Sequence, residues 1–268
     1  MNFLFEKILI LVGDKSNHVA TIHTPQMLYI WPYIVFFSLP LTAVTLVRPA
    51  LRMFPDSAFK ASLQDNLVGS SKVSVPGYMF CNIFTILGLF AVHYNTIVHP
   101  FTLADNRHYV FYVFRVLRRN AGTKYLVIPI YYICAWMTIQ TLASPSEIEG
   151  EDRQDHKESH PTSVETDRQP CRISFILIWL VTAALSVITA PLVEPRYFIV
   201  PYIIWRLHVP NIGASLSSKR ANGRTSYDMR LMLETVWLLA VNAAVGYNFL
   251  YRGFSWPNEP GKIQRFLW

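Results

Sequence analysis

Side chains that could take part in chemistry gather in three short polar segments of the sequence. The densest, residues 99–115, places a carboxylate, an amide, a guanidinium and an imidazole side by side: Asp105, Asn106, Arg107 and His108. After His108 the segment continues with mostly apolar residues, among which Arg115, Arg118 and Arg119 stand at helical spacing. Such a segment can lie in the plane of a membrane surface with its arginines toward lipid phosphates. The alternative is an ordinary basic helix that only anchors the fold.

Two smaller segments also carry ionisable groups. Residues 13–23 hold two charged side chains and two histidines: Asp14, Lys15, His18 and His23. These could bind a sugar hydroxyl or a pyrophosphate oxygen, although short polar loops between membrane spans are common. Residues 193–202 place Glu194 and Arg196 on either side of a proline at the end of an apolar run. Ionisable groups at that depth are costly unless they are paired or used, so a mutual ion pair is the alternative to a binding role.

General motifs indicate no particular catalytic class. The sequence lacks the phosphate-binding loop, the dinucleotide-binding, zinc-protease and nucleophile-elbow motifs, and any pair of cysteines two residues apart. Its three cysteines, Cys81, Cys134 and Cys171, form an odd set that predicts neither a disulfide framework nor a zinc site. His156 and His160 have the spacing of helical metal ligands but stand in a polar loop with no folded support. We therefore predict no metal site.

The elements that must position the polar segments are apolar runs of membrane-spanning length. Of the 268 residues, 52% are hydrophobic and only 15% are charged, whereas soluble domains have about 25% charged residues. A helix needs about 20 mostly apolar residues to cross a bilayer. Five runs approach that length: 27–47, 78–98, 125–143, 173–193 and 231–251. A shorter run, 197–209, contains Pro201 and Arg206 and could be a kinked span or a re-entrant piece. We predict an all-α, polytopic transmembrane helical bundle.

The charged residues fall mostly in the loops between these runs. The net charge of +7 would suggest nucleic acid in a soluble protein, but it is typical of membrane proteins whose loops meet anionic lipid, so we predict no nucleic-acid partner. Residues 147–172 hold eight acidic and four basic residues, and we predict that they form a disordered acidic insertion. If the short run spans the membrane, alternation places all three polar segments on one side.

The polar segments also carry a resemblance to a known family. Four stretches are similar to its signature segments: GDKSNHVATIHTPQMLY at 13–29, HPFTLADNRHYVFYVFRVLRR at 99–119, EPRYFIVPYIIWRL at 194–207 and WPNEPGKIQRFLW at 256–268. They resemble those of the dolichyl-phosphate-glucose-dependent alpha-1,2-glucosyltransferases. The likeness runs in the same order from near residue 10 to residue 268, apart from the acidic insertion, and LADNRHYVFY is long enough to be specific.

The resemblance implies a fold, a place and a reaction. The fold is the GT-C type of membrane glycosyltransferase, and the place is the endoplasmic reticulum membrane, with several spans and the polar segments facing the lumen. The reaction is inverting transfer of the terminal alpha-1,2-linked glucose from dolichyl-phosphate glucose to the diglucosylated lipid-linked oligosaccharide of N-glycosylation. The implied partners are this donor, this acceptor and membrane lipid, and no separate cofactor is implied.

The resemblance also assigns expected roles to single residues. Arg107, His108 and Arg196 suit the phosphate of the donor, because arginine binds phosphate bidentately. Four residues suit sugar hydroxyls: Asp14, His18, Asp105 and Asn106. Tyr109 and Glu194 complete the predicted substrate-binding set.

The catalytic base is expected to lie outside the sequence. The sequence starts about halfway through the family pattern, and we expect residues 1–268 to be the C-terminal half of the membrane domain. The base of such enzymes is an acidic residue early in the family pattern, upstream of Met1, which leaves Asp105 as a weaker candidate. A non-catalytic membrane scaffold or lipid-binding fragment is therefore the main alternative function. A transporter fits less well, because no span centre carries the charges of an ion path.

Overall fold

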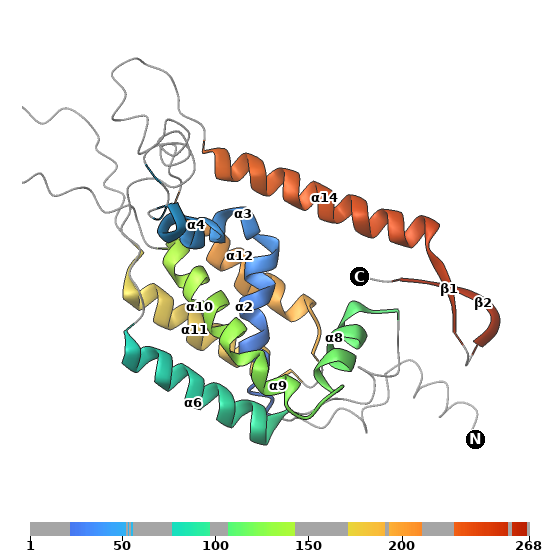
Figure 1. Ribbon diagram of the computed structural model, residues 1–268, viewed down its shortest axis with the longest axis horizontal. Coiled ribbons are helices and arrows are strands. Elements are labelled where there is room, and N and C mark those ends of the chain that lie inside the picture. The colour runs from blue at the N-terminus through green and yellow to red at the C-terminus, as the bar shows by residue number, and fades with distance from the viewer. Residues whose placement is uncertain are drawn as a thin grey trace, which may run out of the picture.

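The computed structural model of the protein describes residues 22–51, 53, 55, 77–96, 107–142, 171–190, 193–210, 228–256 and 259–266. Its helices are α2 (Gln26–Phe37), α3 (Leu39–Thr42), α4 (Val44–Leu51), α6 (Tyr78–Asn95), α8 (Tyr109–Leu117), α9 (Thr123–Leu126), α10 (Ile128–Leu142), α11 (Ile173–Ile188), α12 (Arg196–Leu207) and α14 (Met229–Tyr251). Two strands, β1 (Gly253–Trp256) and β2 (Glu259–Arg265), follow α14. The predicted helical membrane bundle is confirmed (Figure 1). The predicted acidic insertion at 147–172 lies outside the described residues, apart from its last two.

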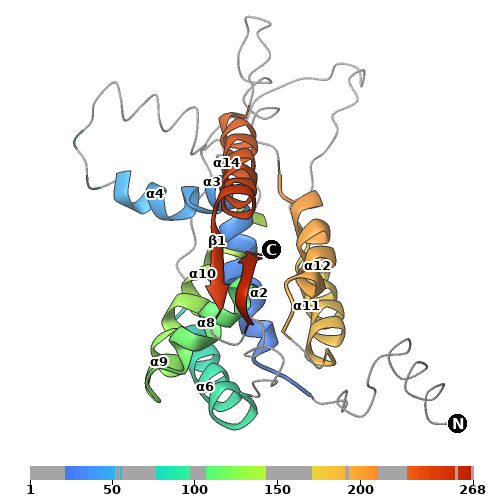
Figure 2. The same cartoon turned by 90° about the vertical axis from the view of Figure 1, so that its right-hand side faces the viewer.

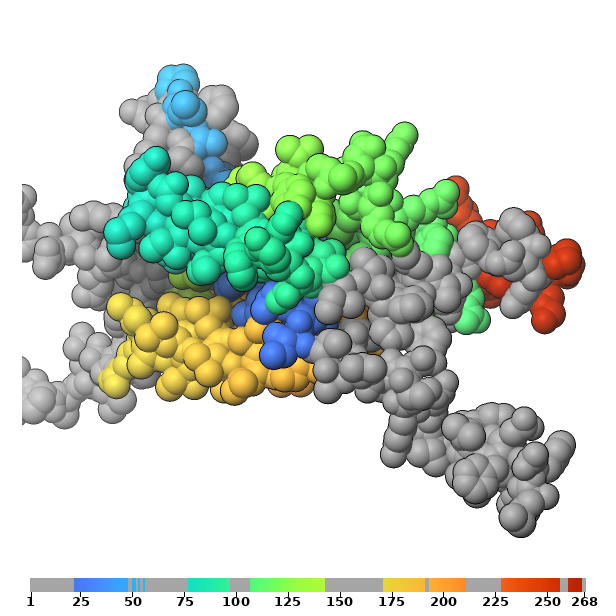
Figure 3. Space-filling view, turned by 90° about the horizontal axis from the view of Figure 1, so that it is seen from below, coloured from blue at the N-terminus to red at the C-terminus, as the bar shows by residue number. Residues whose placement is uncertain are grey.

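Helices α2 and α10 form the centre of the assembly. Helix α6 covers one side and α11 with α12 the other, so that α2 lies between them in Figure 3. Apolar side chains that are at most 1% exposed meet there: Ile30, Ile34, Ala135, Val187 and Trp205. The buried indole of Trp205 donates a hydrogen bond to the carbonyl of Thr138 at 3.1 Å, which supplies the partner that a buried indole N–H requires. This apolar centre holds the helices whose ends carry the polar segments.

The run 27–47 is broken, where the sequence predicted one straight span. Helix α2 meets the segment Leu39–Val47, which comprises α3 and the start of α4, at an angle of 92°. The reason is Pro40, which has no N–H and whose ring clashes with the carbonyl four residues earlier in a continuing helix. That carbonyl, on Phe36, accepts a hydrogen bond from the indole nitrogen of Trp237 at 2.7 Å instead. The break is therefore stabilised by α14.

A buried ion pair fastens α12 and α14 to this break. The guanidinium of Arg206 on α12 donates to both carboxylate oxygens of Glu234 on α14, at 2.6 to 3.1 Å. The hydroxyl of Ser38 donates to the same carboxylate at 3.0 Å and lies 3.1 Å from the hydroxyl of Tyr202. The acid in the last apolar run and the arginine in the short run thus neutralise each other. Pairing of this kind is what makes ionisable groups tolerable among apolar helices.

Fewer helices have spanning length than the sequence predicted. Within the described residues, Thr123–Leu142 and Met229–Tyr251 are long and apolar enough to cross a membrane, and the bent pair α2–α3 would make a third span. Helix α11 is apolar but has only 16 residues, since its run contains Pro191 and helices usually end before a proline. Helix α12 has 12 residues and contains Pro201. Pro191 thus accounts for the length of α11, whereas α12 continues through Pro201.

The chain continues after α14 into an antiparallel hairpin that the sequence analysis did not predict (Figure 2). The guanidinium of Arg265 on β2 donates to the carbonyls of Phe249 and Leu250 at 2.6 and 2.5 Å. These carbonyls belong to the last turn of α14, where backbone acceptors have no partner within the helix. The ring of Phe266 packs against Tyr112 of α8 with centroids 6.1 Å apart. The hairpin thereby caps α14 and joins it to α8.

Candidate substrate-binding end of the bundle

The described parts of the polar segments meet at one end of the bundle. The backbone N–H of His23 donates to the carbonyl of Ile188 at 2.9 Å, which joins the segment before α2 to the end of α11. The amide of Asn95 at the end of α6 donates to the hydroxyl of Thr24 at 3.1 Å. Glu194 lies between α11, which ends at Ile188, and α12, which begins at Arg196. The structure therefore brings residues 23–24 to the ends of α6 and α11. That all three polar segments lie on one side of a membrane stays a prediction.

Cysteine accessibility checks this arrangement in a membrane. With the three native cysteines replaced, a cysteine at Asn106 and one at Glu194 should react with a membrane-impermeant maleimide from the same side. A cysteine at Ser163, in the acidic loop, should react from the opposite side. Labelling of positions 106 and 163 from one side would contradict the shared end.

Helix α8 carries the basic part of the densest segment and is amphipathic as predicted. Phe111 and Phe114 are buried, and the ring of Phe114 packs edge-on against Tyr29 of α2 with centroids 5.9 Å apart. Arg115, together with Arg118 just after the helix, is exposed. The spacing i, i+3 places the two phenylalanines on one face, which is why this short helix docks with its arginines outward.

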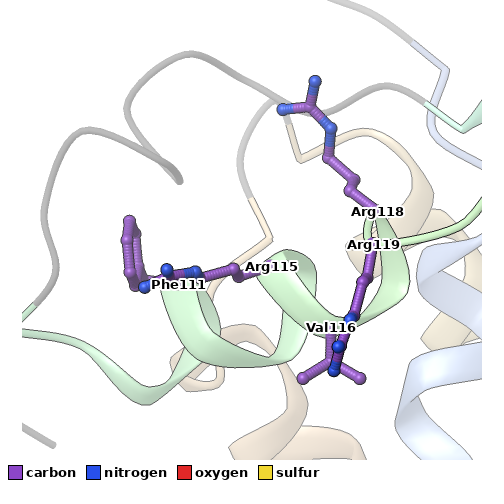
Figure 4. A pocket seen from close by; sticks show the side chains of 5 residues that line it. All are labelled: Phe111, Arg115, Val116, Arg118 and Arg119. Atoms are coloured by element: carbon purple, nitrogen blue, oxygen red, sulfur yellow. The ribbon is translucent and has the colours of Figure 1, made fainter.

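An open pocket of about 660 Å³ lies beside α8 and is lined by Phe111, Arg115, Val116, Arg118 and Arg119. Figure 4 shows the three guanidinium groups pointing in different directions, with Arg118 and Arg119 on opposite sides of the chain. Within the described residues no carboxylate pairs with any of the three. Divergent guanidinium groups suit several separate phosphates, as in a layer of lipid headgroups, better than the two-pronged grip of a single phosphate.

Five of the nine predicted binding residues can be placed in the structure. Arg107 is exposed and lies two residues before the start of α8, and the half-buried His108 is the N-cap residue of that helix. Tyr109 opens the helix, and burial together with the nearby hydroxyl of Tyr33 raises the pKa of its phenol. It therefore stays protonated and can donate a hydrogen bond. The other four lie outside the described residues: Asp14, His18, Asp105 and Asn106.

Glu194 and Arg196 form the mutual ion pair that the sequence left as one alternative. The Arg196 side chain is 69% exposed, and the Glu194 side chain is 23% exposed. A pair this open to solvent adds little stability. The guanidinium also lies 5.7 Å from the ring centroid of Tyr197. A binding role for Arg196 would require a phosphate to share or replace its contact with Glu194.

The structure adds two residues that the predicted set did not include, His23 and Gln26. They are 2% and 0% exposed. The Gln26 amide nitrogen donates to the carbonyl of Ala190 at 2.8 Å and lies 3.3 Å from Nδ1 of His23. Among the described residues, His23 Nε2 and Gln26 Oε1 have no hydrogen-bond partner. The sequence had placed His23 in the polar segment 13–23, but a glutamine after a proline at the start of an apolar run is too common a pattern to single out Gln26.

Burial lowers the pKa of His23 to about 4, so the pH dependence of folding can test its environment. Below pH 6.5 the unfolded chain binds a proton at this residue, whereas the folded chain does not until about pH 4. Stability should therefore fall as pH falls through this window, by at most about 1.4 kcal/mol per pH unit from this group. Unfolding free energies in detergent at pH 7 and pH 5 measure the loss. His23→Gln should show a smaller loss, and equal losses in both proteins would contradict the buried neutral histidine.

Comparisons with known proteins agree with the resemblance in the motifs. A model of the DIE2/ALG10 family matches residues 1–207. A protein of Emericella nidulans named Dol-P-Glc:Glc(2)Man(9)GlcNAc(2)-PP-Dol alpha-1,2-glucosyltransferase is 37% identical over 97% of this chain and 52% of its own length. Proteins of the same name from Aspergillus fumigatus and Yarrowia lipolytica are 35% and 32% identical, over 97% and 99% of this chain and 52% of their own lengths.

The share of each chain that a match covers determines whether the match shows the family. The chain spans about half the length of the curated relatives it matches. No solved structure matches it. The family model, by contrast, covers well over half of the chain. The chain therefore belongs to the DIE2/ALG10 family.

Proposed function

We propose that this chain serves in the transfer of the terminal alpha-1,2-linked glucose from dolichyl-phosphate glucose to the diglucosylated lipid-linked oligosaccharide. The membership of the family carries the proposal, and the names of the curated relatives state this donor, acceptor and linkage. The gathering of the polar segments at one end of the bundle supports it, since donor and acceptor must meet on one side of the membrane. We place that side in the lumen of the endoplasmic reticulum.

The reaction sets the roles of the residues. A base takes the proton of the acceptor hydroxyl, which attacks the anomeric carbon, and the dolichyl phosphate leaves with developing negative charge. We assign Arg107 and His108 to that phosphate, with Arg196 beside them. The start of α8 supports this assignment, because His108 is the N-cap residue of the helix and a helix N-terminus favours an anion.

The remaining predicted residues suit the sugars and the membrane. Asp14, His18, Asp105 and Asn106 have the carboxylate, imidazole and amide groups that bind sugar hydroxyls, and the protonated Tyr109 can donate to one. Arg115, Arg118 and Arg119 would hold α8 against lipid headgroups. We propose that no cofactor is needed, because the donor already carries a phosphate leaving group. The base is assigned to the part of the family length outside this chain, with Asp105 as the weaker candidate.

A reconstituted assay tests the function. Vesicles receive dolichyl-phosphate glucose with labelled sugar and the diglucosylated acceptor, together with this chain alone or joined to the half of the Emericella nidulans relative that it does not match. We expect labelled triglucosylated product from the joined protein and none from the chain alone. Robust transfer by the chain alone would make Asp105 the leading base. No transfer by a folded joined protein would favour the scaffold or lipid-binding alternative.

A further inference from the structure

Helix α14 leaves most of its surface uncovered. Only 11% of its most apolar stretch is buried, compared with 44% in the span Thr123–Leu142. Figure 1 shows the helix along the outer edge of the assembly. Its bonds to the break between α2 and α3 come from Glu234 and Trp237, both within its first three turns. The second half of the helix therefore presents a broad face to its surroundings.

That face contains a polar side chain near the middle of the span. Asn242 is the fourteenth of the 23 residues of α14 and is exposed. Within the described residues its amide makes no hydrogen bond. By comparison, Thr235 on the same helix donates to the carbonyl of Leu231, and the amide of Asn82 on α6 donates to that of Tyr78, both at 2.9 Å. Lipid hydrocarbon offers no hydrogen-bond partner, so an exposed amide at this depth is costly.

The neighbours of Asn242 form a stripe suited to another helix. Thr235, Leu239, Asn242 and Gly246 recur at intervals of four, three and four residues, which places them on one side of the helix. Leu239 is 63% exposed, and a Cβ atom added at Gly246 would meet nothing within 4 Å. Absence of a side chain at Gly246 allows a neighbouring backbone to come close, and polar groups such as Asn bond across membrane helices at such points.

We infer that this Asn242 stripe docks a membrane-spanning helix from the half of the family length that lies outside these 268 residues. The relatives support that occupant, because the chain covers only 52% of their length and a membrane helix with a polar group supplies the hydrogen-bond partner that lipid hydrocarbon lacks. The docked helix presents a hydrogen-bonding group, either a side chain or a carbonyl, to the amide of Asn242. The inference concerns assembly and does not depend on glucosyl transfer.

Crosslinking and co-purification test the inference without any activity measurement. The tagged chain is co-expressed with the unmatched half of the Emericella nidulans relative, and a benzophenone amino acid replaces Leu239 or, as a control, the equally exposed Ile86 of α6. Light should join position 239, but not position 86, to the other polypeptide. Asn242→Leu should lower co-purification about threefold to tenfold. The matched variant Asn82→Leu should leave it unchanged, because that amide is already bonded within its own helix.

Three results would overturn the inference. The first is crosslinking of position 239 to lipid alone, with co-purification of Asn242→Leu at the level of the original chain, because the stripe would then face lipid. The second is a crosslinked product that contains two copies of this chain and none of the other half, because the occupant would then be a second copy. The third is the absence of any crosslinked product between the two polypeptides although both are folded and inserted.

Discussion

Arg107→Ala is expected to lower turnover about a hundredfold to a thousandfold in a family-length enzyme that contains this chain. Arg107 precedes His108, the N-cap residue of α8, and we assign its guanidinium to the leaving phosphate. Loss of one charge-assisted contact that forms in the transition state costs about 2.7 to 4 kcal/mol. Arg107→Lys keeps the charge but loses the planar fork, so it should recover only part of the rate. Initial rates of labelled glucose transfer at matched expression measure all three proteins.

Arg118→Ala is the matched control on the same segment. Its guanidinium diverges from those of Arg115 and Arg119 (Figure 4), and contact with a lipid headgroup is worth about 1 kcal/mol per cation. Because anchoring does not change between ground state and transition state, turnover should fall by less than about threefold. If Arg107→Ala kept full turnover while Arg118→Ala abolished it, the phosphate would belong to the pocket beside α8.

Glu234→Ala is expected to destabilise the folded chain by about 2 to 4 kcal/mol. Removal of the carboxylate leaves Arg206 and the hydroxyl of Ser38 without their acceptor among packed helices. Breaking a fully buried pair costs about 3 to 5 kcal/mol, and the lower range applies because the Arg206 side chain is 28% exposed. The loss also releases α14 from the break between α2 and α3. Unfolding in mixed micelles with increasing dodecyl sulfate measures the change.

Two further variants distinguish the stability lost with the ion pair from the stability lost through a general disturbance of helix packing. Replacing Arg206 and Glu234 together with leucine should restore most of the stability, since apolar residues can substitute for both charges of a buried pair. Glu194→Ala removes the exposed pair with Arg196 and should change stability by less than about 1 kcal/mol. A loss for Glu234→Ala no larger than that for Glu194→Ala would show that the buried network does not hold α14 in place.

Local sequence was sufficient for the class of fold and for several elements. Uncharged runs near bilayer length predict helices because the backbone must satisfy its own hydrogen bonds wherever water is absent. The apolar spacing of Phe111 and Phe114 predicts an amphipathic α8 for the same local reason. Motifs such as LADNRHYVFY were sufficient to indicate the family, and the match to the family model confirms it. These inferences depend only on neighbours along the chain.

Contacts between distant segments were decided by the tertiary structure alone. The sequence predicted one span at 27–47, whereas the structure breaks it at an angle of 92° and joins the carbonyl of Phe36 to Trp237, 201 residues later. Glu234 and Arg206 are 28 residues apart in the sequence, and only the tertiary structure makes them partners. The burial of His23 follows from its contact with the end of α11. The directions of the arginines around α8 depend in the same way on side-chain rotamers and packing, which composition and spacing do not specify.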